Sequence, residues 1–224
     1  YWFGRSEAFE LSQVACHFYL EFDSDIIDIA KLNKSWCQLV ARHDMLRAVI
    51  GGDGQQRILE QLPDYQIPVI DLYGWKAQQA AAYLGRVRHE MSHQVLPADH
   101  WPLFDLRAHI MDAHTMRLNL SFDMLIADVW SFFILFREWQ QLYEQPDVQL
   151  PPLNLSFRDY VLMEQNIRES ADYQRSLAYW SERINDLPLA PELPLAKNPA
   201  SIGKPQFVRR TSMLNCDTWD RLKK

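Results

Sequence analysis

Two neighbouring segments of alternating apolar residues place the strongest constraint on how this chain can fold. Residues 103–111 and 115–122 each carry an apolar side chain at every second position, and a three-residue link joins them. The apolar positions are Phe104, Leu106, Ala108 and Ile110 in the first segment, and Met116, Leu118, Leu120 and Phe122 in the second. Because a period of two is typical of a half-buried strand, the pair predicts a β-hairpin with one face on a core.

Helical and strand patterns lie on both sides of this hairpin. Apolar spacing and capping residues predict helices over 25–42, 75–95, 129–143, 157–169 and 173–185, with a last helix starting at 217. Further strands are predicted over 12–22, 47–50, 56–59, 66–72 and 207–214. The mixture of hairpins and long helices favours an α/β two-layer sandwich, with helices on one face of a mainly antiparallel sheet.

Composition excludes several classes of protein. The 224 residues are 48% hydrophobic, with a net charge of −6 and no basic run, so we expect no nucleic-acid partner. No apolar run reaches the roughly 18 residues that a membrane helix needs. The three cysteines lie far apart, which fits a reducing cytoplasm. No signal peptide opens the chain, and its abrupt ends indicate a fragment of a longer protein.

Residues 89–93 read H-E-x-x-H on a predicted helix, a pattern that can hold a catalytic zinc ion. A catalytic zinc needs a third protein ligand, and no H-x-x-G-x-x-H extension follows. The next histidine, His100, lies beyond Pro97, and two arginines add positive charge to the helix. We therefore interpret this segment as a solvated helix face and expect no metal.

Two acids and a hydroxyl interrupt the apolar stretch between the hairpin and the next helix. Residues 123–131 read D-x-x-x-x-D-x-x-S, formed by Asp123, Asp128 and Ser131. Polar groups in apolar surroundings are costly unless they find partners. Asp128 directly precedes a helix and is well placed to cap it, with Ser131 in the first turn. Asp123 ends a strand, where a carboxylate can meet water or an arginine.

This segment resembles the signature of the heterocyclization domains of nonribosomal peptide synthetases. Related condensation domains carry H-H-x-x-x-D-G at the same place, so Asp123 and Met124 stand for the two histidines and Asp128 for the aspartate. Other stretches are similar to family motifs in the same order, at 1–5, 42–49, 96–107, 156–160, 179–188 and 207–210. The resemblance covers essentially the whole chain.

The resemblance implies a fold like that of chloramphenicol acetyltransferase, with two lobes in a V and a tunnel between them. Residues 1–187 would then form the N-terminal lobe of the domain. Residues 188–205, which are rich in proline, would form a crossover, and residues 206–224 would begin a truncated C-terminal lobe. The fragment alone is expected to be inactive.

The family's reaction implies partners and a carried cofactor. Such domains join a carrier-bound acyl donor to carrier-bound Cys, Ser or Thr and then remove water to give a thiazoline or oxazoline, commonly in siderophore biosynthesis. The implied partners are peptidyl or aryl carrier protein domains and an adjacent adenylation domain. No cofactor would bind this chain directly, because phosphopantetheine is carried by the partner domains. An ordinary condensation or acyltransferase domain, and a non-catalytic carrier-docking module, remain alternative interpretations.

The family motif makes Asp123, Asp128 and Ser131 the candidate catalytic residues. A thioether at Met124 cannot accept a proton, and an ordinary aspartate has a pKa of about 3.9, a poor match to a base at neutral pH. We therefore expect Asp128 to be largely structural, capping its helix and pairing with Arg47 of the second motif. For Asp123 two roles stay open, facing substrate or forming a salt bridge.

Overall fold

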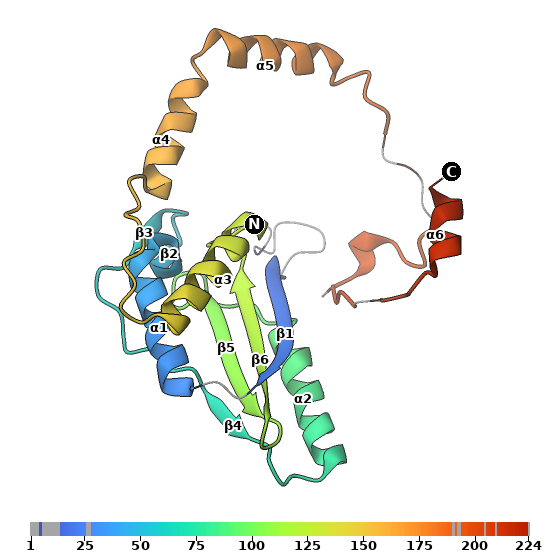
Figure 1. The fold of residues 1–224 in the computed structure, drawn as a ribbon. Helices are drawn as coiled ribbons and strands as arrows, with labels where there is room; N and C mark the ends of the chain where they lie inside the picture. The colour runs from blue at the N-terminus through green and yellow to red at the C-terminus, as the bar shows by residue number, and fades with distance from the viewer. Residues whose placement is uncertain are drawn as a thin grey trace.

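The structure is a computed structural model that describes residues 5, 14–25, 28–189, 191, 194–203, 205–208 and 210–223 (Figure 1). Its strands are β1 (His17–Asp25), β2 (Ala48–Ile50), β3 (Gln56–Ile58), β4 (Val69–Asp71), β5 (Phe104–Ile110) and β6 (Thr115–Asp123). Its helices are α1 (Ile29–Arg42), α2 (Ala77–Met91), α3 (Val129–Glu144), α4 (Phe157–Ile167), α5 (Ala171–Arg183) and α6 (Cys216–Leu222). Short 3-10 helices form at η2 (Asp44–Arg47) and η3 (Pro199–Ser201).

The four-stranded sheet has the order β1-β6-β5-β4. β6 pairs antiparallel with both β1 and β5, and β4 joins β5 in parallel. The predicted hairpin is therefore confirmed as β5 and β6, and the predicted pair of short strands forms the separate β2–β3 ladder. The mainly antiparallel, mixed sheet confirms the fold class.

The main core lies on the face of the sheet that carries the alternating apolar residues. Helices α1 and α3 pack on this face, and the fully buried Trp36 of α1 joins them. Its ring meets Phe104, Phe122 and Trp139 edge-on, with centroids 5.1, 5.9 and 4.9 Å away. Such edge-to-face contacts add to the free energy gained by burying large apolar rings. The core therefore fixes β5, β6 and α3, the elements that hold the candidate motif.

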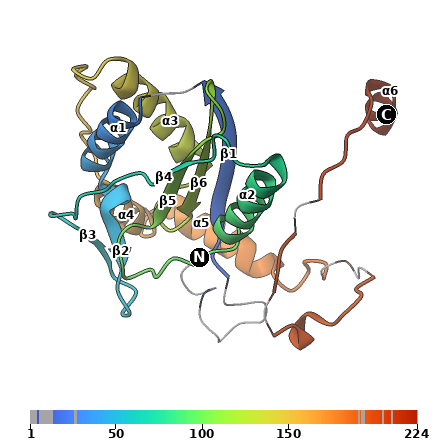
Figure 2. The same cartoon turned by 90° about the horizontal axis from the view of Figure 1, so that it is seen from below.

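Helix α2 covers the opposite face of the sheet (Figure 2). Val87 and Met91 of α2 pack against Tyr19 of β1, and Arg88 forms an ion pair with Glu21. We expected helices on one face, so the second helical cover is a difference from that expectation. Its physical reason is that polar residues line this face, and α2 forms ion pairs with two of them, through Arg88 to Glu21 and through Glu90 to Arg107.

Helices α4 and α5 contain no buried residue. They lead away from the sheet in an arch (Figure 1). Large apolar side chains remain exposed along both helices: Phe157, Tyr160, Leu162, Met163 and Ile167 in α4, and Tyr173, Leu177, Tyr179 and Trp180 in α5. The strand predicted over 207–214 is wrong for the described residues 207–208 and 210–214, which form no ladder. No helix of the described chain is long and apolar enough to cross a membrane.

Candidate functional site

The motif segment forms the connection from β6 to α3. Asp123 is the last residue of β6, and its carbonyl accepts a hydrogen bond of 3.1 Å from the Ile126 amide, which closes a turn. The Met124 amide donates to the Cys16 carbonyl at 2.9 Å, so the turn is also tied to the chain entering β1. These backbone bonds place the two aspartates at opposite ends of one short, fixed loop.

Asp128 caps α3, as predicted. Its Oδ1 accepts hydrogen bonds from the Ser131 amide at 2.8 Å and from the Ser131 hydroxyl at 2.7 Å. The Asp128 amide in turn donates to Ser131 Oγ at 3.2 Å, which completes a reciprocal capping box. The hydroxyl and amide of Ser131 lower the pKa of Asp128, although its side chain is exposed. Asp128 is therefore held as a carboxylate.

Asp123 forms a buried salt bridge, which is one of the two roles left open by the sequence. Only 2% of its side chain is exposed, and Oδ2 contacts the guanidinium of Arg5. Its Oδ1 accepts a hydrogen bond of 3.0 Å from the Leu125 amide. Arg5 also donates to the Leu96 carbonyl at 2.9 Å, and burial lowers the pKa of this arginine. Sequence reasoning missed Arg5 as the partner, and its place in the family's first motif was the one available signal.

The expected pair between Asp128 and Arg47 is wrong. Arg47 Nη2 donates to Asp44 Oδ1 at 2.5 Å, and Nη1 donates to the Leu59 carbonyl at 2.9 Å. Asp44 lies three residues before Arg47 in η2, so the guanidinium pairs with a carboxylate close in sequence instead of with Asp128. Arg47 therefore fixes η2 to the end of β3 and leaves Asp128 with its own helix.

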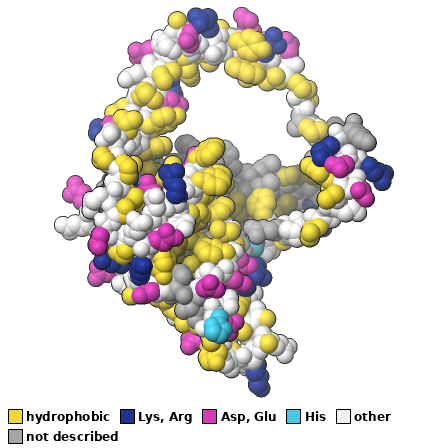
Figure 3. Space-filling model, viewed as in Figure 1, with side chains coloured by type: hydrophobic (Ala, Val, Ile, Leu, Met, Phe, Trp, Pro, Cys, Tyr) yellow, Lys and Arg dark blue, Asp and Glu magenta, His cyan; other side chains and the backbone are white. Residues whose placement is uncertain are grey.

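Met124 is half-buried and packs against the main core. Its thioether therefore contributes apolar contacts to that core. Immediately beyond the loop, Trp130 and Phe133 expose 75% and 64% of their surface, with ring centroids 5.7 Å apart. Figure 3 shows hydrophobic side chains gathered where α3 lies. The loop thus carries two fixed carboxylates beside an exposed apolar surface.

The H-E-x-x-H segment is engaged in other contacts. Glu90 pairs with Arg107 of β5 at 2.8 Å. α2 ends at Met91, so His93 lies beyond the helix, where its ring bonds backbone carbonyls. Within the described ranges, no group of three or more His, Cys, Asp or Glu residues is arranged to hold a metal.

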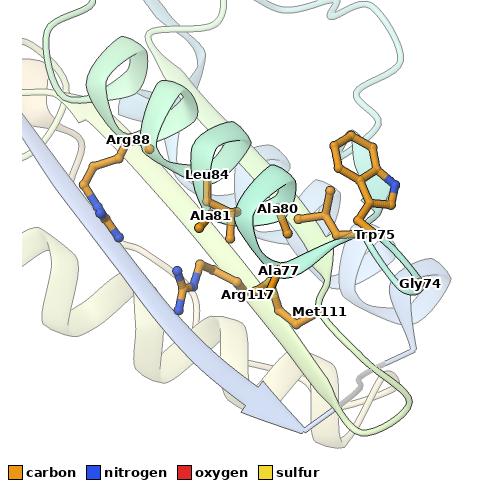
Figure 4. A pocket seen from close by; sticks show the side chains of 11 residues that line it. Gly74, Trp75, Ala77, Ala80, Ala81, Leu84, Arg88, Met111 and Arg117 are labelled. Carbon is orange, nitrogen blue, oxygen red and sulfur yellow. The ribbon is translucent and has the colours of Figure 1, made fainter.

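A cavity of about 510 Å³ lies between α2 and the start of β6 (Figure 4). Small residues of α2 line one side, and Trp75, Arg88 and Arg117 line others. Both arginines already face carboxylates, since Arg88 pairs with Glu21 and Arg117 binds Asp23 through two hydrogen bonds of 2.6 and 2.8 Å. Position 117 is six residues along β6 from the motif, roughly 20 Å at the usual strand rise. The cavity is therefore separate from the motif loop.

Comparison with known proteins gives relatives along the whole chain. Bacitracin synthase 1 of Bacillus licheniformis is 37% identical over 224 residues, which is 100% of this chain and 4% of that protein. Phenyloxazoline synthase MbtB of Mycobacterium sp. (strain MCS) is 35% identical over 222 residues, covering 99% of this chain and 18% of MbtB. The chain therefore spans a small part of the curated relatives that it matches.

A solved structure with the same fold is the EpoB nonribosomal peptide synthetase cyclization-docking bidomain from Sorangium cellulosum. It superposes with a TM-score of 0.87 at 37% identity, over 100% of this chain and 45% of the EpoB chain. The sequence profile of the family described as "Condensation domain" matches residues 5–223. This chain belongs to the condensation domain family of nonribosomal peptide synthetases.

Proposed function

We propose that the chain is the N-terminal part of a heterocyclization domain. Such a domain joins a carrier-bound acyl group to carrier-bound Cys, Ser or Thr and then removes water to form a thiazoline or oxazoline ring. The observation that carries the proposal is the motif loop, where Asp123 and Met124 occupy the positions of the two histidines of a condensation domain. The names of two relatives support it, since MbtB is a phenyloxazoline synthase and the EpoB protein contains a cyclization domain.

The chemistry of the loop argues against imidazole-based acyl transfer at this position. Met124 has no basic atom, and Asp123 is buried against Arg5. Asp128 is committed to its helix cap, and its lowered pKa makes it a weak base at neutral pH. We infer that Asp123, Asp128 and Ser131 shape the loop, and that the groups that move protons during dehydration lie in the part of the domain that is outside this chain.

The rest of the domain needs a surface on which to pack. The EpoB chain is more than twice the length of the part that matches here. We propose that its counterpart packs against the exposed apolar residues of α4, α5 and the start of α3, which no described residue covers. In this arrangement residues 1–187 form the N-terminal lobe, 188–205 the crossover and 206–224 the start of the second lobe.

Both substrates would arrive on phosphopantetheine arms of carrier protein domains, with an adenylation domain loading the acceptor. No protein nucleophile is required, because the acceptor amine attacks the donor thioester directly. The domain contributes by holding the two tethered groups at reacting distance, which replaces a bimolecular encounter by a local one. This role fits a loop that is rigidly capped and ion-paired rather than chemically reactive.

The test is to incubate the complete domain with one carrier loaded with an acyl donor and a second loaded with cysteine, serine or threonine. Mass spectrometry of the acceptor carrier separates the candidate activities. A heterocyclization domain gives a product that is one water lighter than the acylated amino acid. An ordinary condensation domain stops at the amide, and a docking module leaves both carriers unchanged; either result would overturn the proposal.

A further inference from the structure

His93 makes two hydrogen bonds to backbone carbonyls, one within its own segment and one to a distant part of the chain. Its Nδ1 lies 2.8 Å from the carbonyl oxygen of His89, and its Nε2 lies 2.9 Å from the carbonyl oxygen of Phe207. The Phe207 contact joins the end of α2 to residues 205–208, which follow the proline-rich crossover. Pro205 of the same segment is buried, whereas Phe207 and Val208 expose 67% and 66% of their surface, so the segment is held by Pro205 and by the carbonyl of Phe207.

The two carbonyl acceptors favour a ring that carries a hydrogen on both nitrogens. A carbonyl oxygen accepts hydrogen bonds and cannot donate them. For both contacts to be hydrogen bonds, each ring nitrogen has to carry a hydrogen, whereas a neutral imidazole carries one. In a neutral ring, one nitrogen lone pair would point at a carbonyl oxygen less than 3 Å away. We propose that His93 binds the Phe207 carbonyl as an imidazolium, so that docking of residues 205–208 on the end of α2 takes up a proton.

The charged groups around His93 are compatible with a cation. The ring lies just beyond the C-terminus of α2, where the helix dipole and unsatisfied carbonyls favour positive charge. Glu90 and Arg88 of the last helical turn are paired with Arg107 and Glu21 respectively. The docked residues 205–208 (Pro-Gln-Phe-Val) contribute no ionisable side chain.

One titratable neighbour limits the site to a single charge. The His89 ring lies 4.7 Å from the His93 ring, centroid to centroid, so two imidazolium ions would repel each other. The carbonyl of His89, not its ring, accepts the bond from His93. Replacing the His89 side chain therefore keeps the acceptor and removes the competing ring.

Ser92 offers a neutral alternative that can be separated by mutation. Its Oγ lies 3.1 Å from His93 Nδ1 and 3.4 Å from the His89 carbonyl. A neutral ring could accept from this hydroxyl and donate to Phe207, but Nδ1 would then have to leave the His89 carbonyl. Docking through such a neutral ring depends on the Ser92 hydroxyl, whereas docking through an imidazolium does not.

The consequence is a link between pH and the path of the chain between α5 and α6. At low pH the hydrogen bond from His93 to the Phe207 carbonyl connects the segment that follows α5 to the end of α2. At high pH the His93 ring loses one donor, and the carbonyl of Phe207 or of His89 loses its partner. Docking of residues 205–208 should therefore loosen as His93 loses its proton. This inference rests on contacts at α2 and holds whatever reaction the complete domain performs.

Hydrogen exchange of the 224-residue chain tests whether the contact between His93 and Phe207 depends on pH. Peptides spanning residues 205–214 are followed at about pH 5.5 and about pH 8, on either side of the usual histidine range, after correction for intrinsic exchange rates. We expect threefold to tenfold greater protection at the lower pH, roughly what one ordinary hydrogen bond contributes net at an exposed position. His93→Gln should remove this difference, because the amide has donors but does not titrate.

Two matched variants complete the experiment. His89→Gln and Ser92→Ala should both keep the pH-dependent protection, since neither removes the carbonyl acceptors or the His93 ring. Protection that is independent of pH in the unmodified chain would overturn the proposal. Loss of the difference in Ser92→Ala would also overturn it, because that result assigns the contact to a neutral ring that accepts from the hydroxyl.

Discussion

Arg5 and Asp123 form a buried ion pair that ties a residue near the start of the chain to the end of β6. By the motif resemblance, Asp123 corresponds to the first histidine of a condensation-domain motif. The pair neutralises this carboxylate, and the Leu125 amide occupies its other oxygen. The loop is thus fixed from three sides, by Arg5, by the backbone carbonyl of Cys16 just before β1, and by the cap of α3.

Removing one partner of this pair should be strongly destabilising. Asp123→Asn leaves the buried Arg5 guanidinium without its counter-charge, and we expect a loss of about 3 kcal/mol in the free energy of unfolding. Chemical denaturation of the chain measures this loss. Arg5→Ala should cost a similar amount, and the double variant clearly less than the sum of the two.

A surface pair provides the control for that experiment. Asp172 and Arg175 form an exposed i,i+3 pair on α5, with 84% and 75% of their side chains exposed. Asp172→Asn should cost a few tenths of a kcal/mol, as is usual for such pairs. Equal losses at positions 123 and 172 would contradict the structural role of the Arg5 contact.

The helix cap at Asp128 should act independently of Arg47. Asp128→Ala removes the acceptor for the first turn of α3, and we expect a loss of about 1 kcal/mol. Arg47→Ala breaks contacts to Asp44 and Leu59 instead. A double-mutant cycle measured by thermal or chemical unfolding should therefore be additive. A coupling energy well above about 0.5 kcal/mol would contradict this account and support the pairing of Asp128 with Arg47 that the sequence suggested.

Glu138 should contribute to the acid sensitivity of the fold. Burial raises its pKa, but hydrogen bonds from Arg42 at 2.9 Å and His43 at 2.8 Å more than offset this, so its pKa lies below the ordinary value of 4.5. The unfolded state then binds the proton more readily, and the stabilisation is complete above pH 4.5 and lost as pH falls through the folded pKa. Glu138→Gln should flatten the unfolding free energy in that acid range. An unchanged acid slope would contradict this account.

His109 should give a second, separate pH dependence. It is fully buried on β5, and burial lowers its pKa from the ordinary value of 6.5. Below pH 6.5 the unfolded state takes up the proton first, so stability falls from there down to the folded pKa. His109→Leu should remove this slope in pH-dependent unfolding. His114→Gln, at an exposed position in the β5–β6 turn, should leave the slope unchanged.

Local sequence patterns predicted most of the fold. The alternation of residues 103–111 and 115–122 identified β5 and β6, because the face of each that packs on the main core carries the apolar side chains. The predicted helices formed with shifted ends. α1 begins at Ile29 because Asp28, not Asp25, supplies the cap. α2 ends at Met91, so that the two histidines of the H-E-x-x-H segment do not share one helix.

Long-range partners could not be predicted in the same way. The Asp128 cap is local, since Ser131 lies one turn away, and the sequence indicated it. The partner of Asp123 lies 118 positions earlier, and no periodicity links the two. The alternating pattern shows which face of the sheet is apolar, but it does not show what covers the polar face. The ion pairs of Arg88 and Glu90 in α2 with Glu21 and Arg107 join residues far apart in the sequence, so the pattern could not predict them.

The choice of acceptor tests heterocyclization most directly. The complete domain is supplied with one acyl donor and, in parallel reactions, with carriers loaded with cysteine or with alanine. Both amines can form an amide, but alanine has no side-chain nucleophile that could attack the new carbonyl. The account predicts acylated alanine without further change, and a cysteine product that is lighter than its amide by one water. Acylated cysteine, serine and threonine that all retain this water would contradict it.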